Sequence, residues 1–189
     1  MKRMTRNLKY IFIVLILVFA GTSCMKEKLE MTYTNQESKI DQYINSNKYT
    51  DNTKTDSLRV VYNGGSARLV LKEGAGEELN ANGTAAIYYA GYVFNGNKSK
   101  TNLFITNHED TAKGAGWELT DENFDIYQFN MSDTKFVEGL RNGLLGIKGG
   151  EHCQILFSGK YGFGNEEFGI IPANSALLYE IWVEAISND

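Results

Sequence analysis

Residues 136–177 read FVEGLRNGLLGIKGGEHCQILFSGKYGFGNEEFGIIPANSAL, and this stretch decides the fold. Its first part predicts a short helix that ends near Leu145, because three apolar residues recur at the spacing of one helix face. They are Phe136, Leu140 and Leu144. Ser132 or Asp133 can cap the start of this helix. We therefore expect one short helix that buries a single face.

Gly149 and Gly150 turn the chain into a predicted strand over Glu151–Phe157. Neighbouring strand residues point to opposite faces, so His152 and Cys153 cannot act together as a base and a nucleophile. We expect Cys153 to be a small core residue, together with Ile155 and Phe157, and His152 to be a surface residue. A glycine-punctuated loop over Ser158–Ser175 then leads to a final strand over Ala176–Ile186.

Upstream of this stretch, runs of β-forming residues predict four further strands. They cover Leu58–Tyr62, Ala67–Lys72, Thr84–Phe94 and Phe124–Met131. Polar residues predict loops over Glu73–Gly83 and Asn95–Asn123, the second long enough to be functional or flexible. Apolar residues at helical spacing predict an N-terminal helix over Asn35–Ser46, capped by Thr34 or Asn35. The order of elements predicts an α+β fold with an antiparallel sheet.

The N-terminus has the layout of a secretory signal, in which basic residues precede a short apolar run at Tyr10–Ala20. The run is shorter than the roughly 20 residues that span a bilayer, so a transmembrane anchor is the weaker alternative. Gly21-Thr22-Ser23-Cys24 resembles the lipobox of bacterial lipoproteins, in which the cysteine is lipidated. We expect a signal peptide at 1–23, a tether and helix at 24–57, and a domain at 58–189 with its core at 74–187. The chain would then sit in the cell envelope, anchored to a membrane by lipid and facing the periplasm or the cell surface.

The composition excludes several classes of protein. The 19 basic and 23 acidic residues give a net charge of −4, which leaves no basic footprint for nucleic acid. Removal of residues 1–23 takes away four basic residues and leaves 15 against 23 acidic ones. Two cysteines and two histidines exclude zinc-finger and disulfide-scaffold proteins, and no nucleotide or metal motif is present. We expect no cofactor and no metal.

The order of motifs in the last third resembles the FKBP-type peptidyl-prolyl cis-trans isomerases. The matching stretches are Phe136–Leu140, Gly143–Gly150, Tyr161–Gly164 and Gly169–Leu177, with Ile87–Gly91 upstream. The resemblance covers about residues 74–186. It implies a twisted antiparallel sheet, an FKBP-like half-barrel, curled around one short helix. It also implies a monomer that binds Xaa-Pro segments of unfolded or exported proteins.

The resemblance further implies an aromatic pocket between helix and sheet that carries the catalysis. Its lining would be Tyr89, Phe104, Tyr127, Phe136, Val137, Leu140, Phe163, Ile170, Ile171 and Tyr179, with Phe129 on the same strand as Tyr127. Rotation of a prolyl amide crosses a barrier of about 18–20 kcal/mol, which comes from C–N resonance. An apolar pocket removes the preference of water for the planar, charge-separated amide, so no nucleophile is needed.

Three positions depart from the family pattern. Ile105 stands where a carboxylate is usual, Phe163 where a tyrosine is usual, and Leu140 where a tryptophan is usual. These changes leave two alternatives to an isomerase that assists the folding of exported proteins. One is a module that binds peptides without catalysis. The other is a surface-assembly lipoprotein that makes its contacts through residues 95–123.

Overall fold

The computed structural model describes the backbone of residues 2–49, 56–132 and 135–189, and side chains within these ranges from residue 25 onward. The chain divides into two compact units, Met1–Asn35 and Gln36–Asp189. The expected lipidation at Cys24 and the side chains of the expected signal peptide lie outside the described residues. Among the described residues, no helix combines the length and the apolar character needed to cross a membrane.

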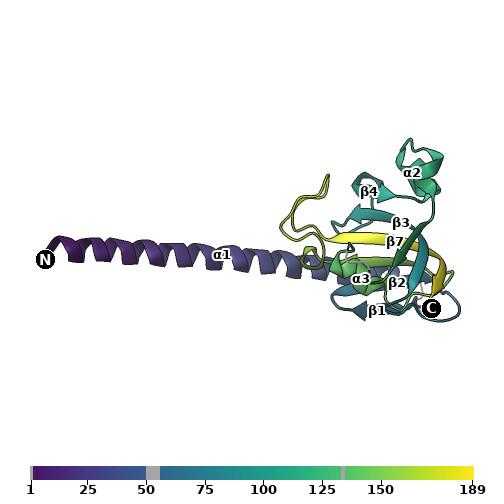
Figure 1. Ribbon diagram of the computed structural model, residues 1–189, viewed down its shortest axis with the longest axis horizontal. Coiled ribbons are helices and arrows are strands. Elements are labelled where there is room, and N and C mark those ends of the chain that lie inside the picture. Colours follow the sequence, from purple (N-terminus) through teal and green to yellow (C-terminus); the bar gives the residue numbers. More distant parts are fainter. Residues whose placement is uncertain (1, 50–55, 133–134) are drawn as a thin grey trace. The chain divides into compact units, whose positions relative to one another are not determined.

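The second unit contains an antiparallel sheet of seven strands, of which six follow the order β1-β2-β6-β7-β3-β4 and the seventh, β5, pairs with β3. The strands are β1 (Val60–Asn63), β2 (Ser66–Lys72), β3 (Thr84–Val93), β4 (Leu103–Thr106), β5 (Tyr127–Asn130), β6 (His152–Phe157) and β7 (Leu177–Ser187). The helices are α1 (Lys2–Asn47), α2 (Glu109–Ala115) and α3 (Glu138–Leu144), with 3-10 turns η1 (Lys100–Asn102), η2 (Asp121–Phe124) and η3 (Gly159–Tyr161). Figure 1 shows the sheet curling around α3. The predicted fold class is therefore confirmed.

Strand β3 lies next to the edge of the sheet and changes partners along one side. β7 pairs with β3 from Thr84 to Val93 on one side. On the other side β5 pairs with Thr84–Ile87, and β4 pairs with Ala90–Tyr92. The sheet edge therefore forks between Ile87 and Ala90.

The two faces of the sheet bury separate apolar clusters. One cluster packs under α3 and includes Leu144, Ile155 and Phe157, all fully buried. The other lies on the opposite face, where Ile40 and Ile44 from the last part of α1 pack against β2, β3, β6 and β7. The alternation predicted for β6 is confirmed, because Cys153, Ile155 and Phe157 share the α3 face while Leu156 joins the other cluster.

The predicted starts of two helices were wrong. The N-terminal helix does not start at a cap near residue 34, because the Thr34 hydroxyl donates to the Glu30 carbonyl inside α1. Residues 25–34, expected within a tether, are helical, and their Lys, Glu, Leu and Met residues favour a helix. Helix α3 starts at Glu138 after the N-cap Val137, several residues later than expected.

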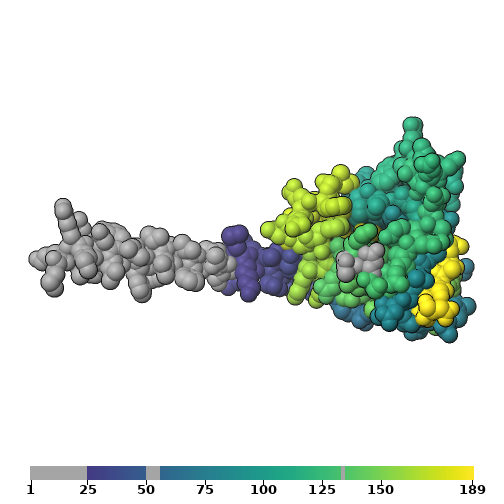
Figure 2. Space-filling model, in the orientation of Figure 1, coloured from purple at the N-terminus to yellow at the C-terminus, as the bar shows by residue number. Residues whose placement is uncertain are grey.

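The stretch 95–123, predicted to be a loop, contains η1, β4, α2 and the start of η2. Helix α2 is mostly polar, with Ala112 buried and Ala115 partly buried, so no apolar periodicity predicted it. Gly116 in the left-handed conformation ends the helix. The segment around α2 stands out from the surface of the second unit (Figure 2).

His152 is more than a surface residue. Its ring stacks on Trp182 at 4.9 Å between centroids, and its Nε2 lies 3.1 Å from the Glu180 carboxylate. Both partners lie on β7, directly beside β6, so the sheet register brings them to His152. Cys153 is fully buried, as predicted.

Candidate functional site

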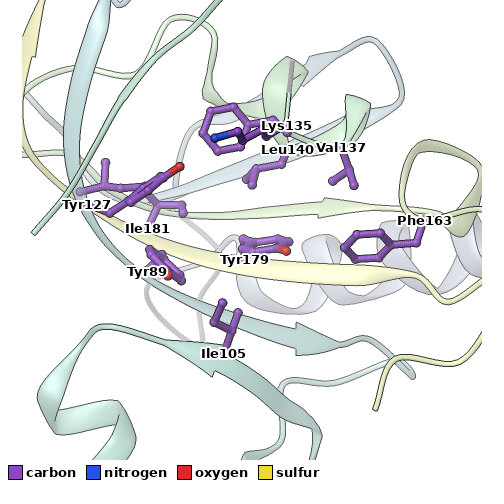
Figure 3. Close-up of a pocket in the computed structure, with 11 residues that line it drawn as sticks. Tyr89, Ile105, Tyr127, Lys135, Val137, Leu140, Phe163, Tyr179 and Ile181 are labelled. Carbon is purple, nitrogen blue, oxygen red and sulfur yellow. The ribbon is translucent and has the colours of Figure 1, made fainter. Parts of the chain in front are cut away.

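A cavity of about 180 Å³ opens between α3 and the curled sheet (Figure 3). Its lining is almost entirely aromatic and aliphatic. The lining residues are Ile87, Tyr89, Ile105, Tyr127, Lys135, Phe136, Val137, Leu140, Phe163, Tyr179 and Ile181. The volume corresponds to about six water molecules at 30 Å³ each, which is room for a small apolar side chain.

Three tyrosines form the sheet side of the cavity. Tyr89 and Tyr127 meet edge to face across the β3–β5 pair, with centroids 5.9 Å apart and an interplanar angle of 78°. Tyr179 on β7 stands next along the sheet, and Phe104 packs edge-on against it at 5.8 Å. Such edge-to-face geometry is the favoured arrangement of aromatic rings. The wall is therefore a set of mutually fixed rings.

Burial changes the pKa of two tyrosine hydroxyls in this wall. It raises the pKa of Tyr89, with a smaller contribution from Tyr127. Burial also raises the pKa of Tyr179, which is only 8% exposed, and neighbouring Tyr89 adds to the effect. Both phenols therefore stay protonated at neutral pH and can donate hydrogen bonds. Lys135 adds an ammonium group to the lining.

Helix α3 supplies the opposite side of the cavity because two glycines seat it close to the sheet. A Cβ atom on Gly139 would lie 2.3 Å from the Phe157 ring, and one on Gly143 would lie 2.2 Å from Ile155. No real side chain fits at these distances. The close approach brings Leu140 onto the cavity, together with Val137 just before the helix.

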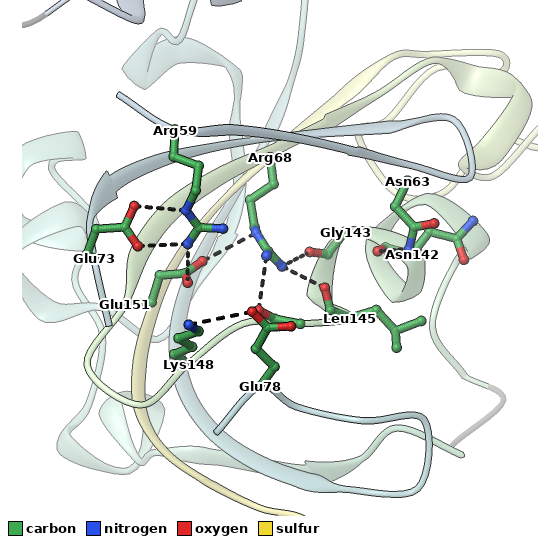
Figure 4. A network of polar contacts seen from close by, with 11 residues as sticks. Arg59, Asn63, Arg68, Glu73, Glu78, Asn142, Gly143, Leu145, Lys148 and Glu151 are labelled. Carbon is green, nitrogen blue, oxygen red and sulfur yellow. Dashed lines mark hydrogen bonds and ion pairs between the residues drawn. The ribbon is translucent and has the colours of Figure 1, made fainter. Parts of the chain in front are cut away.

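Arg68 fixes the other end of α3 (Figure 4). The side chain is 3% exposed and donates to the carbonyls of Gly143 and Leu145 at 2.8 Å and of Gly146 at 3.1 Å. Its Nε lies 3.3 Å from the buried carboxylate of Glu151. These carbonyls belong to the helix end, where no intrahelical donor remains for them. A buried cation on β2 thus satisfies the C-terminus of α3 and holds it on the sheet.

Seven of the ten residues expected in the pocket do line the cavity. They are Tyr89, Tyr127, Phe136, Val137, Leu140, Phe163 and Tyr179. Phe104 packs behind Tyr179, whereas Ile171 is buried in the core and Ile170 is 68% exposed. Reciprocal backbone hydrogen bonds join Ile171 to Phe168, whose ring stacks on that of Phe163.

Three lining residues escaped the sequence analysis, namely Ile87, Lys135 and Ile181, and Ile105 was named only as a departure from the family pattern. Ile87 and Ile181 lie two residues from Tyr89 and Tyr179 on the same strands, so the period of a β-strand could have found them. Ile105 lines the cavity in place of Phe104 where the β3–β4 register shifts between Gly91 and Tyr92. No pattern in the sequence marked that irregularity.

The arrangement suits binding and desolvation better than proton transfer or metal chemistry. Apolar and phenolic groups surround the cavity, and Ile105 adds a further apolar side chain from β4. Within the part of the chain that the structure describes, no three His, Cys, Asp or Glu side chains gather in metal-binding geometry. A small apolar group with a polar amide beside it would find both an apolar floor and phenolic donors here.

Comparison with known proteins adds a family to this geometry. The sequence model of the family described as FKBP-type peptidyl-prolyl cis-trans isomerase matches residues 76–184. FK506-binding protein 1 of Aspergillus oryzae is 24% identical over 117 residues, which cover 62% of this chain and 94% of that protein.

Solved structures of plant proteins share the fold. The three FKBP domains of wheat FKBP73 match with a TM-score of 0.56 and 23% identity, over 71% of this chain and 53% of that chain. A multi-domain immunophilin from Arabidopsis thaliana matches with a TM-score of 0.52 and 18% identity, over 69% and 46%. The N-terminal domain of Arabidopsis FKBP42 gives the same score and identity, over 69% and 93%. The chain spans about half the length of the first two.

Proposed function

The chain belongs to the FKBP-type peptidyl-prolyl cis-trans isomerase family, and from this premise we propose that it accelerates Xaa-Pro isomerisation in exported proteins as they fold. The reaction is slow without help, taking tens to hundreds of seconds, and can limit folding. The proposal covers the reaction, the clients and the place where it occurs.

The observation that carries the proposed reaction is the apolar cavity with its two neutral phenols. A prolyl ring seated among Tyr89, Tyr179 and Leu140 would leave water, and the Xaa-Pro amide would follow it. The planar amide then loses the solvation that favours it over the twisted form. A hydroxyl of the tyrosine wall can donate to the amide carbonyl and orient it. The rate increase in this scheme needs no covalent intermediate.

NMR exchange spectroscopy on a short Leu-Pro peptide tests the reaction directly. Catalytic amounts of the protein should broaden and exchange the cis and trans resonances of the peptide, and a Leu140→Glu variant should lose this effect. The charged side chain would put an unpaired carboxylate against the apolar cavity. An unaltered exchange rate at a high concentration of folded wild-type protein would contradict the proposal.

A second candidate function is peptide binding without catalysis, and Ile105 and Phe163 favour it. Both lie on the cavity without a polar group, where the family usually has a carboxylate and a phenol. Phe163→Tyr would return a hydroxyl to the cavity. If the protein is a binder that lacks only this donor, the variant should catalyse exchange that the wild type does not. If the wild type already catalyses exchange, binding alone is no longer sufficient as a description.

The export part of the proposal rests on the N-terminal sequence. A basic start, an apolar run and Cys24 after small residues support a lipid-anchored protein of the cell envelope. Expression of Cys24→Ser beside the wild type tests the anchor through membrane fractionation. The wild type should enter the membrane fraction and the variant should not. A variant that stays with the membrane would exclude Cys24 as the anchor.

A further inference from the structure

Asn107 fills the fork in the sheet edge between β4 and β5. It is only 4% exposed and comes directly after β4. At this point the N–H and C=O groups of Tyr89 point away from β7. They lie beyond the end of the β3–β5 pairing, which stops at Ile87. Without a partner they would be buried, unsatisfied polar groups, which destabilise a fold.

The side-chain amide of Asn107 satisfies this gap on both sides. Its Oδ1 accepts the N–H of Tyr89 at 2.6 Å. Its Nδ2 donates to the carbonyl of Ile87 at 3.3 Å and to that of Asp125 at 3.0 Å. The backbone N–H of Asn107 donates to the Tyr89 carbonyl, which also accepts from the Thr106 hydroxyl. One residue therefore ties β3 to the segment that enters β5.

These contacts reach the cavity through two of the three tyrosines of its wall. Tyr89 is bonded to Asn107 directly, and Asp125 lies two residues before Tyr127. The Tyr89 and Tyr127 rings stand 5.9 Å apart, and Tyr127 is 38% exposed, at the solvent side of the cavity. A change in the spacing of the two backbones at the fork would move the two rings against each other.

We propose that Asn107 is a positioning residue that sets the spacing of Tyr89 and Tyr127 and thereby the affinity of the cavity for a proline-containing segment. The proposal rests on the proposed function, since it names what holds that site in shape. Asn107 itself does not line the cavity. Its effect is on binding of the peptide in all its states, so it should change KM more than kcat.

The test compares Asn107→Ala with wild type in peptide exchange and in NMR titration with the Leu-Pro peptide. We expect KM and Kd to rise about fivefold to tenfold, the equivalent of one lost hydrogen bond to a buried group, with kcat changed less than twofold. A purely structural role would lower kcat through a smaller folded fraction and leave KM unchanged. Unchanged KM and Kd in a folded Asn107→Ala protein would overturn the proposal.

Asn188→Ala serves as the matched control. Asn188 also bridges backbone segments, accepting from the N–H of Asn80 and donating to the carbonyl of Glu78, but it does not line the cavity. Its loss should leave KM unaltered. Asn107→Asp keeps the acceptor for Tyr89 and replaces the donor that faces two carbonyls with an oxygen, so it should weaken binding at least as much as Asn107→Ala.

A measurement on the wild type covers the case in which neither variant folds. The Asn107 side-chain amide protons should exchange slowly, and the Tyr89 and Tyr127 rings should show mutual NOEs. Fast exchange of the amide protons would overturn the proposal. Peptide binding without catalysis would contradict the proposed function alone, whereas an unchanged Kd in Asn107→Ala would contradict the role of Asn107 alone.

Discussion

His108 and Trp182 stack face to face, with ring centroids 3.9 Å apart and planes within 4° of parallel. His152 also stacks on this indole, with the ring centroids 4.9 Å apart. Both histidines of the chain therefore stack on one tryptophan. Trp182 lies next to Ile181 on β7, so adjacent residues of one strand serve the histidine stack and the cavity from opposite faces of the sheet.

This stack predicts that stability falls as the pH drops below about 6.5. Burial lowers the pKa of His108, and Asp110 and Glu180 offset this only in part. The unfolded chain, with an ordinary pKa near 6.5, then takes up the proton more readily than the folded one. The stabilising contribution is complete above that pH and is lost as the pH falls. Urea unfolding at pH 7.5 and 5.5 measures the effect.

His108→Phe is the control for this prediction. Phenylalanine keeps a ring on Trp182 but does not titrate, so the loss of stability between pH 7.5 and 5.5 should shrink. Protonation of Glu180 affects stability only at a lower pH than protonation of His108. Burial alone would raise its pKa, but the hydrogen bonds from His152 and Lys98 outweigh burial and hold the pKa below the usual value. Equal losses in the wild type and His108→Phe would place the pH dependence elsewhere.

Tyr89→Ala should weaken peptide binding. The substitution removes one ring of the cavity wall and the edge-to-face contact with Tyr127. A ring contact of this kind contributes about 0.5–1.5 kcal/mol beyond its buried area, so Kd should rise at least threefold to tenfold. NMR titration with the Leu-Pro peptide gives the Kd. Tyr62→Ala, which removes a tyrosine that is 63% exposed and remote from the cavity lining, should bind like wild type.

Gly139→Ala should destabilise the protein and impair the cavity together. The added methyl group would press on the Phe157 ring and lift α3 from the sheet, at a cost of about 1–3 kcal/mol for an overpacked core. Chemical unfolding measures the loss, and peptide titration should show weaker binding because Leu140 moves with the helix. Gly114→Ala in α2 meets no atom within 4 Å and should be neutral or slightly stabilising. If Gly139→Ala left the free energy of unfolding unchanged, α3 would not be closely packed on the sheet, and the prediction would be wrong.

Arg68→Met should lower the free energy of unfolding by about 3–5 kcal/mol, as expected when one partner of a buried ion pair is removed. It leaves the helix-end carbonyls of Gly143 and Leu145 without their donor. Lys113→Met breaks an ion pair with Glu109 within α2 that is exposed on both sides, and should cost far less. Equal losses in the two variants, measured by urea unfolding, would contradict the capping role of Arg68.

The sequence predicted those elements of the fold that are determined by the types of neighbouring residues. β3 was placed to within one residue because it is dense in β-forming residues. Helix α2 was missed because a short polar helix has no apolar face, and its stop at Gly116 depends on a backbone angle. The late start of α3 escaped prediction because Val137, which shows no side-chain capping bond, is its N-cap.

The candidate site followed the same rule. Tyr89 and Tyr179 lie on long strands whose alternation fixes their direction, and the motif order of the family located both. The exchange of Phe104 for Ile105 depends on a register shift that no spacing in the sequence displays. Asn107 is one asparagine among many in a polar stretch. Its importance arises only when the fork of the sheet leaves the backbone of Tyr89 in need of a partner.

Cys153 lies fully buried in β6, and burial, more than any other influence, raises the pKa of its thiol well above the usual range. Such a thiol reacts with an alkylating reagent only when the sheet opens around it. If Cys24 carries lipid, Cys153 is the one thiol left in the mature chain. The rate of Cys153 alkylation in whole cells would then measure how often the sheet opens in the protein's own compartment, without an engineered label.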